Sequence, residues 1–168
     1  MKRFALLRLS VGLSLLLFLL LQGGCSSTPP AHPSSQQPVP SKLSLEQAND
    51  VTLYAISLVG TPYRYGGNTP ASGFDCSGLV HHVYRTRGGV VSPRTVTSMK
   101  NWGQPVEVTQ LRSGDLVIFS QANGVPNHAG IYVGNNRFVH SPSTGGTVRL
   151  DHLNSKYWAA RRPSFRRP

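Results

Sequence analysis

Cysteine is scarce in this 168-residue sequence, which contains only Cys25 and Cys76. Short ligand pairs such as C-x-x-C or H-x-x-x-H are missing, and this disfavours a zinc site, although a Cys/His/His set could also bind zinc. No internal repeat is visible, and the main apolar segment, Leu9–Leu21, is too short for a comfortable transmembrane span. The length allows one modest domain with additional segments, and no cofactor or metal is expected.

The first 24 residues have the pattern of a secretory signal peptide. Three basic residues, Lys2, Arg3 and Arg8, accompany the apolar segment, and small residues lead from it to Cys25. This arrangement resembles a bacterial lipoprotein signal, which implies that Cys25 is acylated and becomes the mature N-terminus. Several acyl chains would anchor the protein stably to a membrane.

Two neighbours of Cys25 bear on this interpretation. Gln22 stands three positions before the cysteine, where lipoprotein signals usually have an aliphatic residue, so an ordinary cleaved signal and an uncleaved anchor remain alternatives. Ser26, rather than aspartate, follows the cysteine. By resemblance to Gram-negative lipoproteins, this implies a lipid anchor in the outer membrane, with the protein on its periplasmic face. Residues 25–41 would then form a lipidated Cys and a disordered Ser/Pro-rich tether.

Acidic residues are also few. Six Asp and Glu against 17 Lys and Arg give a net charge of +11, and removing the three basic signal residues leaves 14 basic and 6 acidic residues, or +8. A basic exported protein favours an anionic partner, such as lipid phosphates or the carboxylates of peptidoglycan, and its location disfavours nucleic acid. Arg161, Arg162, Arg166 and Arg167 lie near the C-terminus, and a solvated tail explains them at least as well as a binding surface. The last two belong to a basic tail predicted over residues 164–168.

Residues 42–163 show the periodicities of one α+β domain. Ser44 and Gln47 match a capping box at the start of a first helix, which Gly60 and Pro62 end. Helices followed by a β-meander predict N-terminal helices packed on an antiparallel β-sheet of about five to six strands. The helices are expected over residues 44–59, 76–86 and 93–102, and the strands over residues 116–119, 128–133, 137–140, 147–150 and 157–160.

Cys76 lies at the start of the second predicted helix, between glycine-containing stretches. If Cys25 carries lipid, Cys76 has no disulfide partner in an oxidising compartment, so it is either a buried structural residue or kept for its chemistry. At a helix N-terminus the positive end of the dipole is expected to lower the pKa of the thiol and to favour the thiolate. The free backbone N–H of Cys76 could also stabilise an oxyanion.

Two histidines bracket a predicted hairpin. His128 opens one strand, seven residues before Asn135 in the turn, and His140 closes the next strand, five residues after it. Antiparallel pairing brings both to the same end of the sheet if a bulge or small stagger is allowed. If the Cys76 helix packs there, the order sulfur–imidazole–imidazole predicts Cys76 as nucleophile, His128 as base and His140 as the residue that orients His128.

The other histidines have simpler explanations. His81 and His82 fall inside the second predicted helix, where solvent-exposed or structural roles are the simpler interpretation. His32 and His152 look like surface residues.

Six motifs follow one another through nearly all of residues 45–163. They are Gly60-Thr61-Pro62-Tyr63-Arg64-Tyr65-Gly66-Gly67, Asp75-Cys76-Ser77-Gly78-Leu79-Val80, Pro93-Arg94-Thr95, Leu111-x-x-Gly114-Asp115-Leu116-Val117-x-Phe119, His128-Ala129-Gly130-Ile131-Tyr132 and Phe138-Val139-His140-Ser141. In this order they resemble the NlpC family of papain-like cell-wall cysteine peptidases. The resemblance implies a papain-like α+β fold and hydrolysis of peptidoglycan stem peptides.

The resemblance also implies roles for individual residues. It makes Cys76 the nucleophile, His128 the base and His140 the residue that orients His128. It also places Tyr63 near the oxyanion, and Asp75 and Ser77 on the substrate side. Asp75 could equally be only the helix cap, and Tyr63 only a packed aromatic residue.

The lipoprotein signal, the short tether and the lack of an extra wall-binding module resemble the small Spr-type murein endopeptidases. That subgroup cuts the cross-link between D-alanine and the meso-diaminopimelate of a neighbouring stem, whereas other family members cut between γ-D-glutamate and diaminopimelate, and no residue here decides between the two bonds. Competing interpretations are a catalytically retired peptidoglycan-binding lipoprotein, against which the intact site argues, and a thiol acyltransferase or amidase. A regulatory protease or adaptor would control a wall hydrolase, but no residue shows one.

Overall fold

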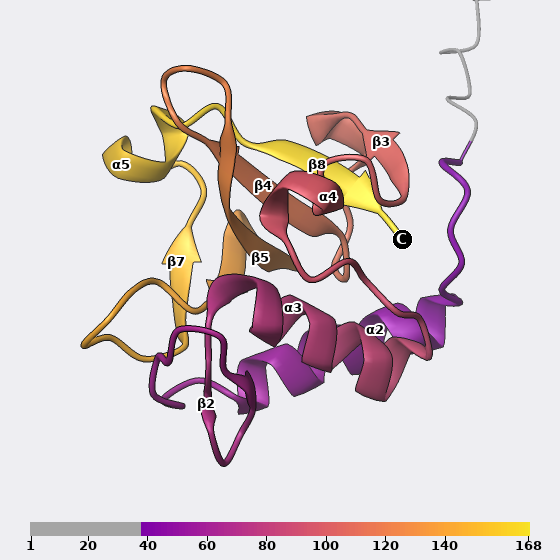
Figure 1. The fold of residues 1–168 in the computed structure, drawn as a ribbon. Coiled ribbons are helices and arrows are strands. Elements are labelled where there is room, and N and C mark those ends of the chain that lie inside the picture. The colour runs from indigo at the N-terminus through magenta and orange to yellow at the C-terminus, as the bar shows by residue number, and fades with distance from the viewer. Residues whose placement is uncertain (1–37) are drawn as a thin grey trace, which may run out of the picture. The chain divides into compact units, whose positions relative to one another are not determined.

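The computed structural model describes residues 38–168 (Figure 1). The predicted signal peptide, Cys25 and the tether up to residue 37 lie outside the described residues. The helical elements are α2 (Leu45–Ser57), α3 (Cys76–Val83), a π-helical turn (Tyr84–Gly88), α4 (Val96–Met99), a 3₁₀ turn (Val108–Gln110) and α5 (Lys156–Ala159). The strands are β1 (Asn68–Thr69), β2 (Gly73–Phe74), β3 (Gln104–Val106), β4 (Leu116–Ser120), β5 (Pro126–Gly134), β6 (Arg137–His140), β7 (Arg149–His152) and β8 (Ser164–Arg167). No helix in this part of the chain is long and apolar enough to cross a membrane.

Six strands form one antiparallel sheet in the order β3-β8-β4-β5-β6-β7, and β1 and β2 form a separate two-stranded ribbon. Helices α2 and α3 lie next to each other and pack against β5 (Figure 1). The predicted α+β architecture, with N-terminal helices on an antiparallel sheet, is confirmed.

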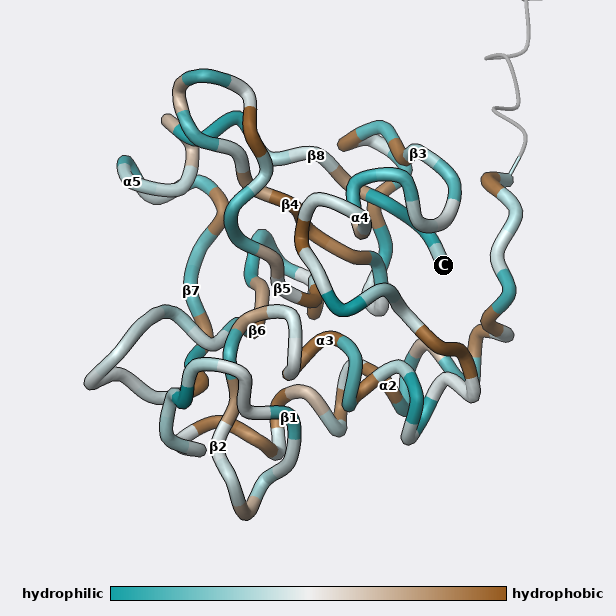
Figure 2. The backbone as a smooth tube through the Cα atoms, viewed as in Figure 1, coloured by the Kyte–Doolittle hydropathy of each residue, from teal (hydrophilic) through white to brown (hydrophobic). Residues whose placement is uncertain are grey.

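The sheet buries a different apolar cluster on each face, because successive strand residues point to opposite sides. In β4, Leu116 and Ile118 join the cluster that α2 and α3 cover, whereas Val117 and Phe119 join a second cluster with Trp158. Figure 2 shows the corresponding hydrophobic stretches along β4 and α3. The second cluster surrounds the histidine pair described below.

The first helix begins where its capping box predicts. The Ser44 hydroxyl accepts a hydrogen bond from the backbone N–H of Gln47 at 3.1 Å, and the Gln47 side chain accepts one from the Ser44 N–H at 2.9 Å. Val51 and Ala55, on the buried face, are fully inaccessible to solvent. This face anchors α2 to the π-helical turn after α3, where the Gln47 amide donates to the carbonyl of Gly88 at 3.1 Å.

The hairpin between β5 and β6 turns at two asparagines with left-handed backbone conformation. Asn135 has φ 50° and Asn136 has φ 59°, values that suit the tight turns whose twist matches paired strands. The register shifts between Tyr132 and Gly134, which is the stagger that residue counting required. The shift brings the two strand ends that carry histidine to the same end of the sheet.

The prediction of a strand over residues 157–160 is wrong, because this segment forms helix α5. Ser155 caps the helix by accepting a hydrogen bond from the backbone N–H of Trp158 at 3.4 Å. The indole ring of Trp158 is buried in the second cluster. A single aromatic residue that packs from a short helix gives no helical periodicity, so the sequence favoured a strand.

The prediction of a solvated basic tail over residues 164–168 is also wrong. Strand β8 lies inside the sheet, between β3 and β4. Arg167 is only 4% exposed, and its guanidinium donates to both carboxylate oxygens of Asp115, at 2.9 and 2.8 Å. A buried arginine requires a partner of this kind, and the partner stands 52 residues away in the chain.

Two further elements differ in extent from the prediction. The third helix, expected over residues 93–102, is reduced to α4, which begins after its N-cap Thr95. The strand expected over residues 147–150 is shifted to β7, Arg149–His152. The shift matters for the site, because it places Asp151 within the sheet beside β6.

Candidate active site

Cys76 is the first residue of α3, and Asp75 is the N-cap of this helix. One carboxylate oxygen of Asp75 accepts hydrogen bonds from the backbone N–H of Gly78 at 2.6 Å and from the Ser77 hydroxyl at 2.9 Å. The other oxygen accepts from the backbone N–H of Gly66 at 2.9 Å. Asp75 therefore stabilises the first turn of the helix and ties it to the preceding loop.

A glycine contact brings that loop close to the cysteine. A Cβ atom on Gly78 would lie 1.9 Å from the carbonyl oxygen of Gly67, so only glycine fits at position 78. The loop holds Tyr63 beside the helix start. Burial raises the pKa of the Tyr63 phenol, and the charges of Cys76 and then Asp75 raise it further.

The sulfur of Cys76 reaches β5 next to the first histidine. The backbone N–H of Ala129, the residue after His128, is within hydrogen-bonding reach of the sulfur. Helix α3 packs on β5 and also contacts β6. The structure therefore brings the helix start and the histidine-bearing end of the sheet together, as the sequence predicted.

The thiol is not activated in the way that its helical position suggested. Burial raises the pKa of Cys76, and the Asp75 carboxylate raises it further. The N–H groups of Ala129, Ser77 and Cys76 itself lower the pKa by less. The expectation of a resting thiolate is therefore reversed, and Cys76 rests as a neutral thiol.

The two histidines are in direct contact. Nε2 of His128 lies 2.8 Å from Nδ1 of His140, and their rings meet edge to face, with centroids 4.9 Å apart. The rings of Phe119 and Trp158 pack on His128, and those of Phe138 and Trp158 on His140. The aromatic surroundings fix both imidazoles and leave little of either ring exposed.

A third member of this series, Asp151, was missed by the sequence analysis. One of its carboxylate oxygens, Oδ2, accepts from Nε2 of His140 at 3.0 Å and from Nε1 of Trp158 at 2.8 Å. The same oxygen accepts from Nε and Nη2 of Arg149, at 3.2 and 3.0 Å. Asp151 thereby holds His140 from the side opposite to His128.

The carboxylate determines which nitrogens carry protons. An ionised carboxylate can only accept, so Nε2 of His140 carries the proton and Nδ1 of His140 is an acceptor. The bond at 2.8 Å then requires a proton on Nε2 of His128, which leaves the lone pair on its Nδ1. One acid thus selects the tautomer of two consecutive imidazoles and leaves His128 with a free basic nitrogen.

Both imidazoles are neutral at pH 7. Burial lowers the pKa of His128 to about 3, and the positive charges of His140, Arg161 and Arg149 act in the same direction. Burial also lowers the pKa of His140 to about 4, against the opposing effect of Asp151. Since the thiol is neutral as well, the resting site holds a thiol and a free base rather than an ion pair.

The remaining predicted site residues are near the sulfur, with different surroundings. Ser77 is only 7% exposed and its hydroxyl is bonded to Asp75, so it supports the helix cap rather than lining an open surface. Asp75 has the capping role that the sequence left open, while its charge also acts on the thiol. Tyr63 is half-buried, and its backbone forms a bridge with Phe74, two residues before Cys76.

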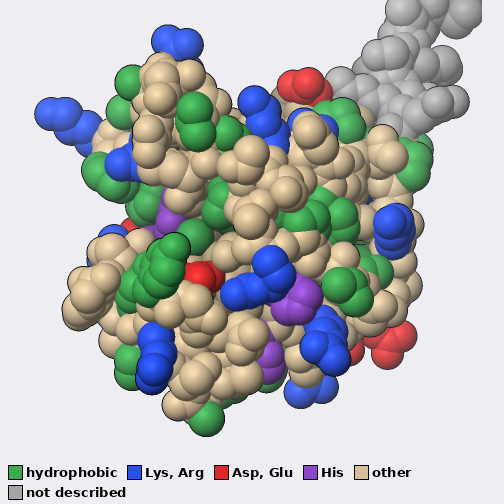
Figure 3. All heavy atoms as spheres, viewed as in Figure 1, with side chains coloured by type: hydrophobic (Ala, Val, Ile, Leu, Met, Phe, Trp, Pro, Cys, Tyr) green, Lys and Arg blue, Asp and Glu red, His purple; other side chains and the backbone are tan. Residues whose placement is uncertain are grey.

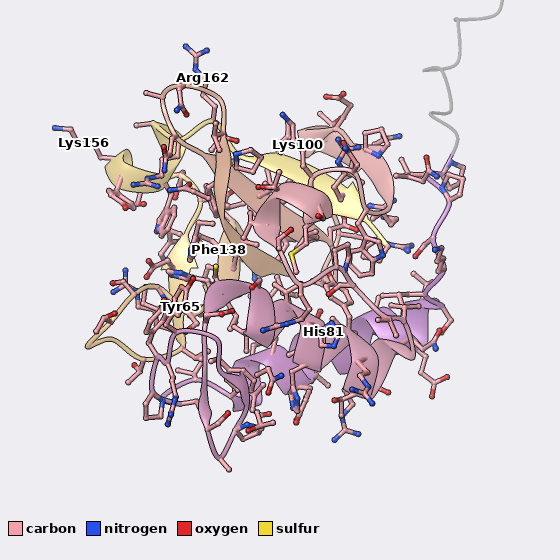
Figure 4. All side chains as sticks on the ribbon, viewed as in Figure 1. Tyr65, His81, Lys100, Phe138, Lys156 and Arg162 are labelled. Carbon is pink, nitrogen blue, oxygen red and sulfur yellow. The ribbon has the colours of Figure 1, made fainter. Side chains whose placement is uncertain are left out.

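The histidines expected to be structural have structural contacts. Nδ1 of His81 lies 2.9 Å from the carbonyl oxygen of Ser92, and Nε2 of His82 lies 2.9 Å from the hydroxyl of Tyr54. Figure 4 shows His81 on α3, away from Phe138, which packs on the histidine pair. Within residues 38–168, no group of three or more His, Cys, Asp or Glu side chains is arranged to hold a metal ion.

A signal for Asp151 does exist in the sequence. It is the only acidic residue after Asp115, and it follows a predicted strand in an otherwise basic region. Because that strand was expected to end at Leu150, Asp151 fell outside the predicted sheet. With the observed register, Asp151 pairs with Phe138, two residues before His140.

The charge of Asp75 leads to a prediction about thiol reactivity. Asp75→Asn keeps an oxygen for the helix cap but removes the negative charge that raises the thiol pKa. We therefore expect the midpoint of the pH profile for alkylation of Cys76 by iodoacetamide to move to lower pH. In the wild type the midpoint should lie above the 9.0 of an unperturbed thiol. The exposed Asp50→Asn serves as control, and an unchanged midpoint in Asp75→Asn would contradict the assignment.

Comparison with known proteins agrees with this geometry. Residues 60–167 match the model of the NlpC/P60 family. The chain is 39% identical over 121 residues to the murein DD-endopeptidase MepH of Escherichia coli K12, covering 70% of this chain and 45% of the relative. It is 40% identical over 108 residues to the murein DD-endopeptidase MepS/murein LD-carboxypeptidase of the same strain, covering 64% and 56%. The chain thus spans about half the length of these curated relatives.

Solved structures show the same fold. A crystal structure of an NlpC/P60 family protein from Bacillus cereus superposes with a TM-score of 0.67 at 28% identity, covering 77% of this chain and 41% of that one. The papain-like fold and the family resemblance inferred from the motifs are both confirmed. On sequence and on structure alike, this chain belongs to the NlpC/P60 family.

Proposed function

We propose that this protein is a cysteine endopeptidase of peptidoglycan stem peptides and that it cuts the D-alanine–meso-diaminopimelate cross-link. The observation that supports it most is the hydrogen-bonded series His128–His140–Asp151, which lies on strands against which the Cys76 helix packs. The choice of bond follows the two relatives named as DD-endopeptidases. An intact series of this kind also argues against a retired binding protein.

The first half of the reaction starts from a neutral Cys76 thiol and a neutral His128 imidazole. As the Cys76 sulfur attacks the carbonyl carbon, the thiol proton moves to Nδ1 of His128. The imidazolium that forms is stabilised by His140, and through it by the negative charge of Asp151. The backbone N–H of Cys76 and the phenol of Tyr63 are the donors available to the oxyanion. When the amide C–N bond breaks, His128 returns the proton to the leaving nitrogen and a thioester remains.

The second half of the reaction regenerates the enzyme. Nδ1 of His128, again unprotonated, takes a proton from water, and the resulting hydroxide attacks the thioester carbonyl. The C–S bond breaks, the sulfur recovers the proton, and the peptide leaves with a new carboxylate. One water is consumed for each bond cut.

Mass spectrometry of muropeptides after digestion of purified sacculi tests the proposal. We expect cross-linked dimers to be converted to monomers with uptake of one water per cut. Products truncated after γ-D-glutamate would assign the other stem-peptide bond instead, and products whose mass shows transfer rather than water addition would indicate an acyltransferase. Sedimentation with sacculi without any released product would contradict the proposal and support a binding role.

Asp151 should contribute to turnover through the tautomers of the two histidines. Asp151→Ala is expected to lower kcat by about 10–100-fold, less than the roughly 10⁴-fold known when a directly bonded acid is lost and the base takes the wrong tautomer. Asp151→Asn should lose less, since its amide oxygen can still accept from His140. ¹⁵N NMR of the imidazoles is the second measurement. It reports which ring nitrogens carry protons, and a purely structural role of Asp151 would leave these tautomers unchanged.

In the wild type, both rings should be protonated at Nε2. In Asp151→Ala we expect a mixture of tautomers and a still lower pKa of His140, since Asp151 raises it. His152→Gln, which changes the exposed next residue of β7 and leaves the carboxylate in place, is the matched control. Unchanged tautomers together with unchanged kcat in Asp151→Ala would show that Asp151 has no positioning role.

We also propose that Cys25 is acylated and that the protein is anchored in the outer membrane, facing the periplasm. The proposal is supported by the signal-like first 24 residues and by Ser26 after the cysteine. Incorporation of labelled palmitate into the wild type but not into Cys25→Ala, followed by membrane fractionation, tests both parts. Recovery of label in the inner membrane would contradict the localisation.

A further inference from the structure

A small hollow opens beside the catalytic base. It has a volume of about 280 Å³, and His128 forms part of its wall. The other side chains that matter here are Arg149, Tyr157 and Arg161, which come from β7, from α5 and from the residues that follow it. No Asp or Glu lines this hollow, so its wall combines two guanidinium groups with the edge of the reactive site.

Arg161 has no carboxylate partner among the described residues. The ion pairs of residues 38–168 join Asp151 to His140 and Arg149, and Asp115 to Arg167. The Arg161 guanidinium instead lies over the ring of Tyr157, with its carbon 4.5 Å from the ring centroid, and 5.8 Å from that of Trp158. Stacking on aromatic rings orients a guanidinium while its N–H groups stay available for a ligand.

The two arginines act on the base itself. Their positive charges are among the causes that lower the pKa of His128. The electrostatic potential of the two guanidinium groups therefore extends to the imidazole of His128. Arg149 uses Nε and Nη2 to hold Asp151 and is otherwise about half exposed. Arg161 is therefore the cation whose charge is free to attract an anion into the pocket.

The positive character continues beyond Arg161. This residue also borders a larger cleft of about 780 Å³, where Lys100 and Arg162 are the other charged lining residues. The face shown in Figure 3 carries many Lys and Arg side chains and few Asp or Glu side chains. At the N-terminus of α3, Asp75 is the charged neighbour of the sulfur. The site thus has a negative end at the helix cap and a positive end at the base.

The position of the pocket indicates which part of a substrate it would hold. A general acid must lie next to the leaving nitrogen, so the pocket that shares His128 receives the leaving fragment. In the proposed cross-link, the carbon attached to the leaving nitrogen of diaminopimelate also carries a free carboxylate. A guanidinium in a partly water-excluded hollow recognises such a group by charge-assisted hydrogen bonds.

We propose that Arg161, supported by Arg149, forms a carboxylate-binding subsite for the leaving fragment of the substrate. The inference rests on the proposed endopeptidase function. It makes Arg161 a specificity residue: the carboxylate holds the scissile nitrogen at His128, and substrates whose carboxylate is neutralised are cut more slowly.

Two synthetic cross-linked peptides test the subsite with the purified protein. They are identical except that the carboxylate next to the scissile nitrogen is free in one and a primary carboxamide in the other. We expect kcat/KM of the wild type to be about tenfold higher for the free acid, in the range of one charge-assisted hydrogen bond. In Arg161→Gln this ratio should fall to near one, and Arg161→Lys should restore part of it.

The ratio separates the possible failures. Loss of folding would slow both peptides equally and leave the ratio unchanged, whereas loss of carboxylate recognition changes the ratio itself. Arg87→Gln is the matched control, because Arg87 also lies over a tyrosine, at 4.7 Å from the Tyr54 ring centroid, in a pocket that contains Asp50. Equal cleavage of both peptides by the wild type would overturn the subsite. An unchanged ratio in an Arg161→Gln protein whose circular dichroism spectrum matches that of the wild type would also overturn it. Cleavage of neither peptide by the wild type would instead contradict the proposed function.

Discussion

Replacing Cys76 with alanine is expected to bring the release of muropeptides below detection, a loss of about 10⁴-fold or more in kcat. No other thiol lies within the described residues, and His128 alone can only activate water against an unactivated amide. The first residue of a helix accepts alanine readily, so the fold should remain. Muropeptide analysis measures the loss, and circular dichroism with thermal unfolding measures the fold.

The double variant Cys76→Ala/His128→Ala makes this prediction sharper. The thiol and its base act as a unit, so removing both should cost no more than removing either alone. A folded Cys76→Ala protein that digests sacculi at the wild-type rate would contradict covalent catalysis. A double variant much slower than both single variants would show that the two residues act independently.

Arg167→Ala is expected to lower the free energy of unfolding by about 3–5 kcal/mol. The substitution leaves the carboxylate of Asp115, which is only 1% exposed, without its guanidinium partner. The carbonyl oxygen of Gln110 also loses a donor at 2.6 Å. Because small domains are typically stable by about 5–15 kcal/mol in total, one side chain near the C-terminus would carry much of the stability. Urea unfolding followed by tryptophan fluorescence measures the change.

The matched control is Arg162→Ala, which removes an exposed arginine five residues earlier and should change stability by less than about 0.5 kcal/mol. The pair Asp115→Leu/Arg167→Met should recover much of the loss, since an apolar pair leaves no buried charge. A loss below about 1 kcal/mol in Arg167→Ala would show that water reaches Asp115, contrary to its burial.

The two C-terminal elements, α5 and β8, both support the strands and side chains of the site. Strand β8 pairs with β4, and β4 pairs with β5, which begins with the segment that carries His128. Helix α5 places Trp158 against both imidazoles and donates its indole N–H to Asp151. A region that the sequence suggested to be partly a tail therefore completes the surroundings of the base.

The sequence by itself determined the features that depend on near neighbours. The capping box, the turn at Asn135 and Asn136 and the start of α3 at Cys76 follow from side chains only a few residues apart. Pairing across a short hairpin then placed His128 and His140 together by counting. The motifs were sufficient to assign the family.

Only the tertiary structure decided the features that depend on distant partners. The resting charge of Cys76 follows from burial and from Asp75, which outweigh the helix terminus. The register of β7 on β6 places Asp151 in the site. Arg167 can be buried in the sheet because its charge is paired with that of Asp115. Burial and long-range charge pairing are properties of the packed chain, and the local pattern around each of these residues contains neither.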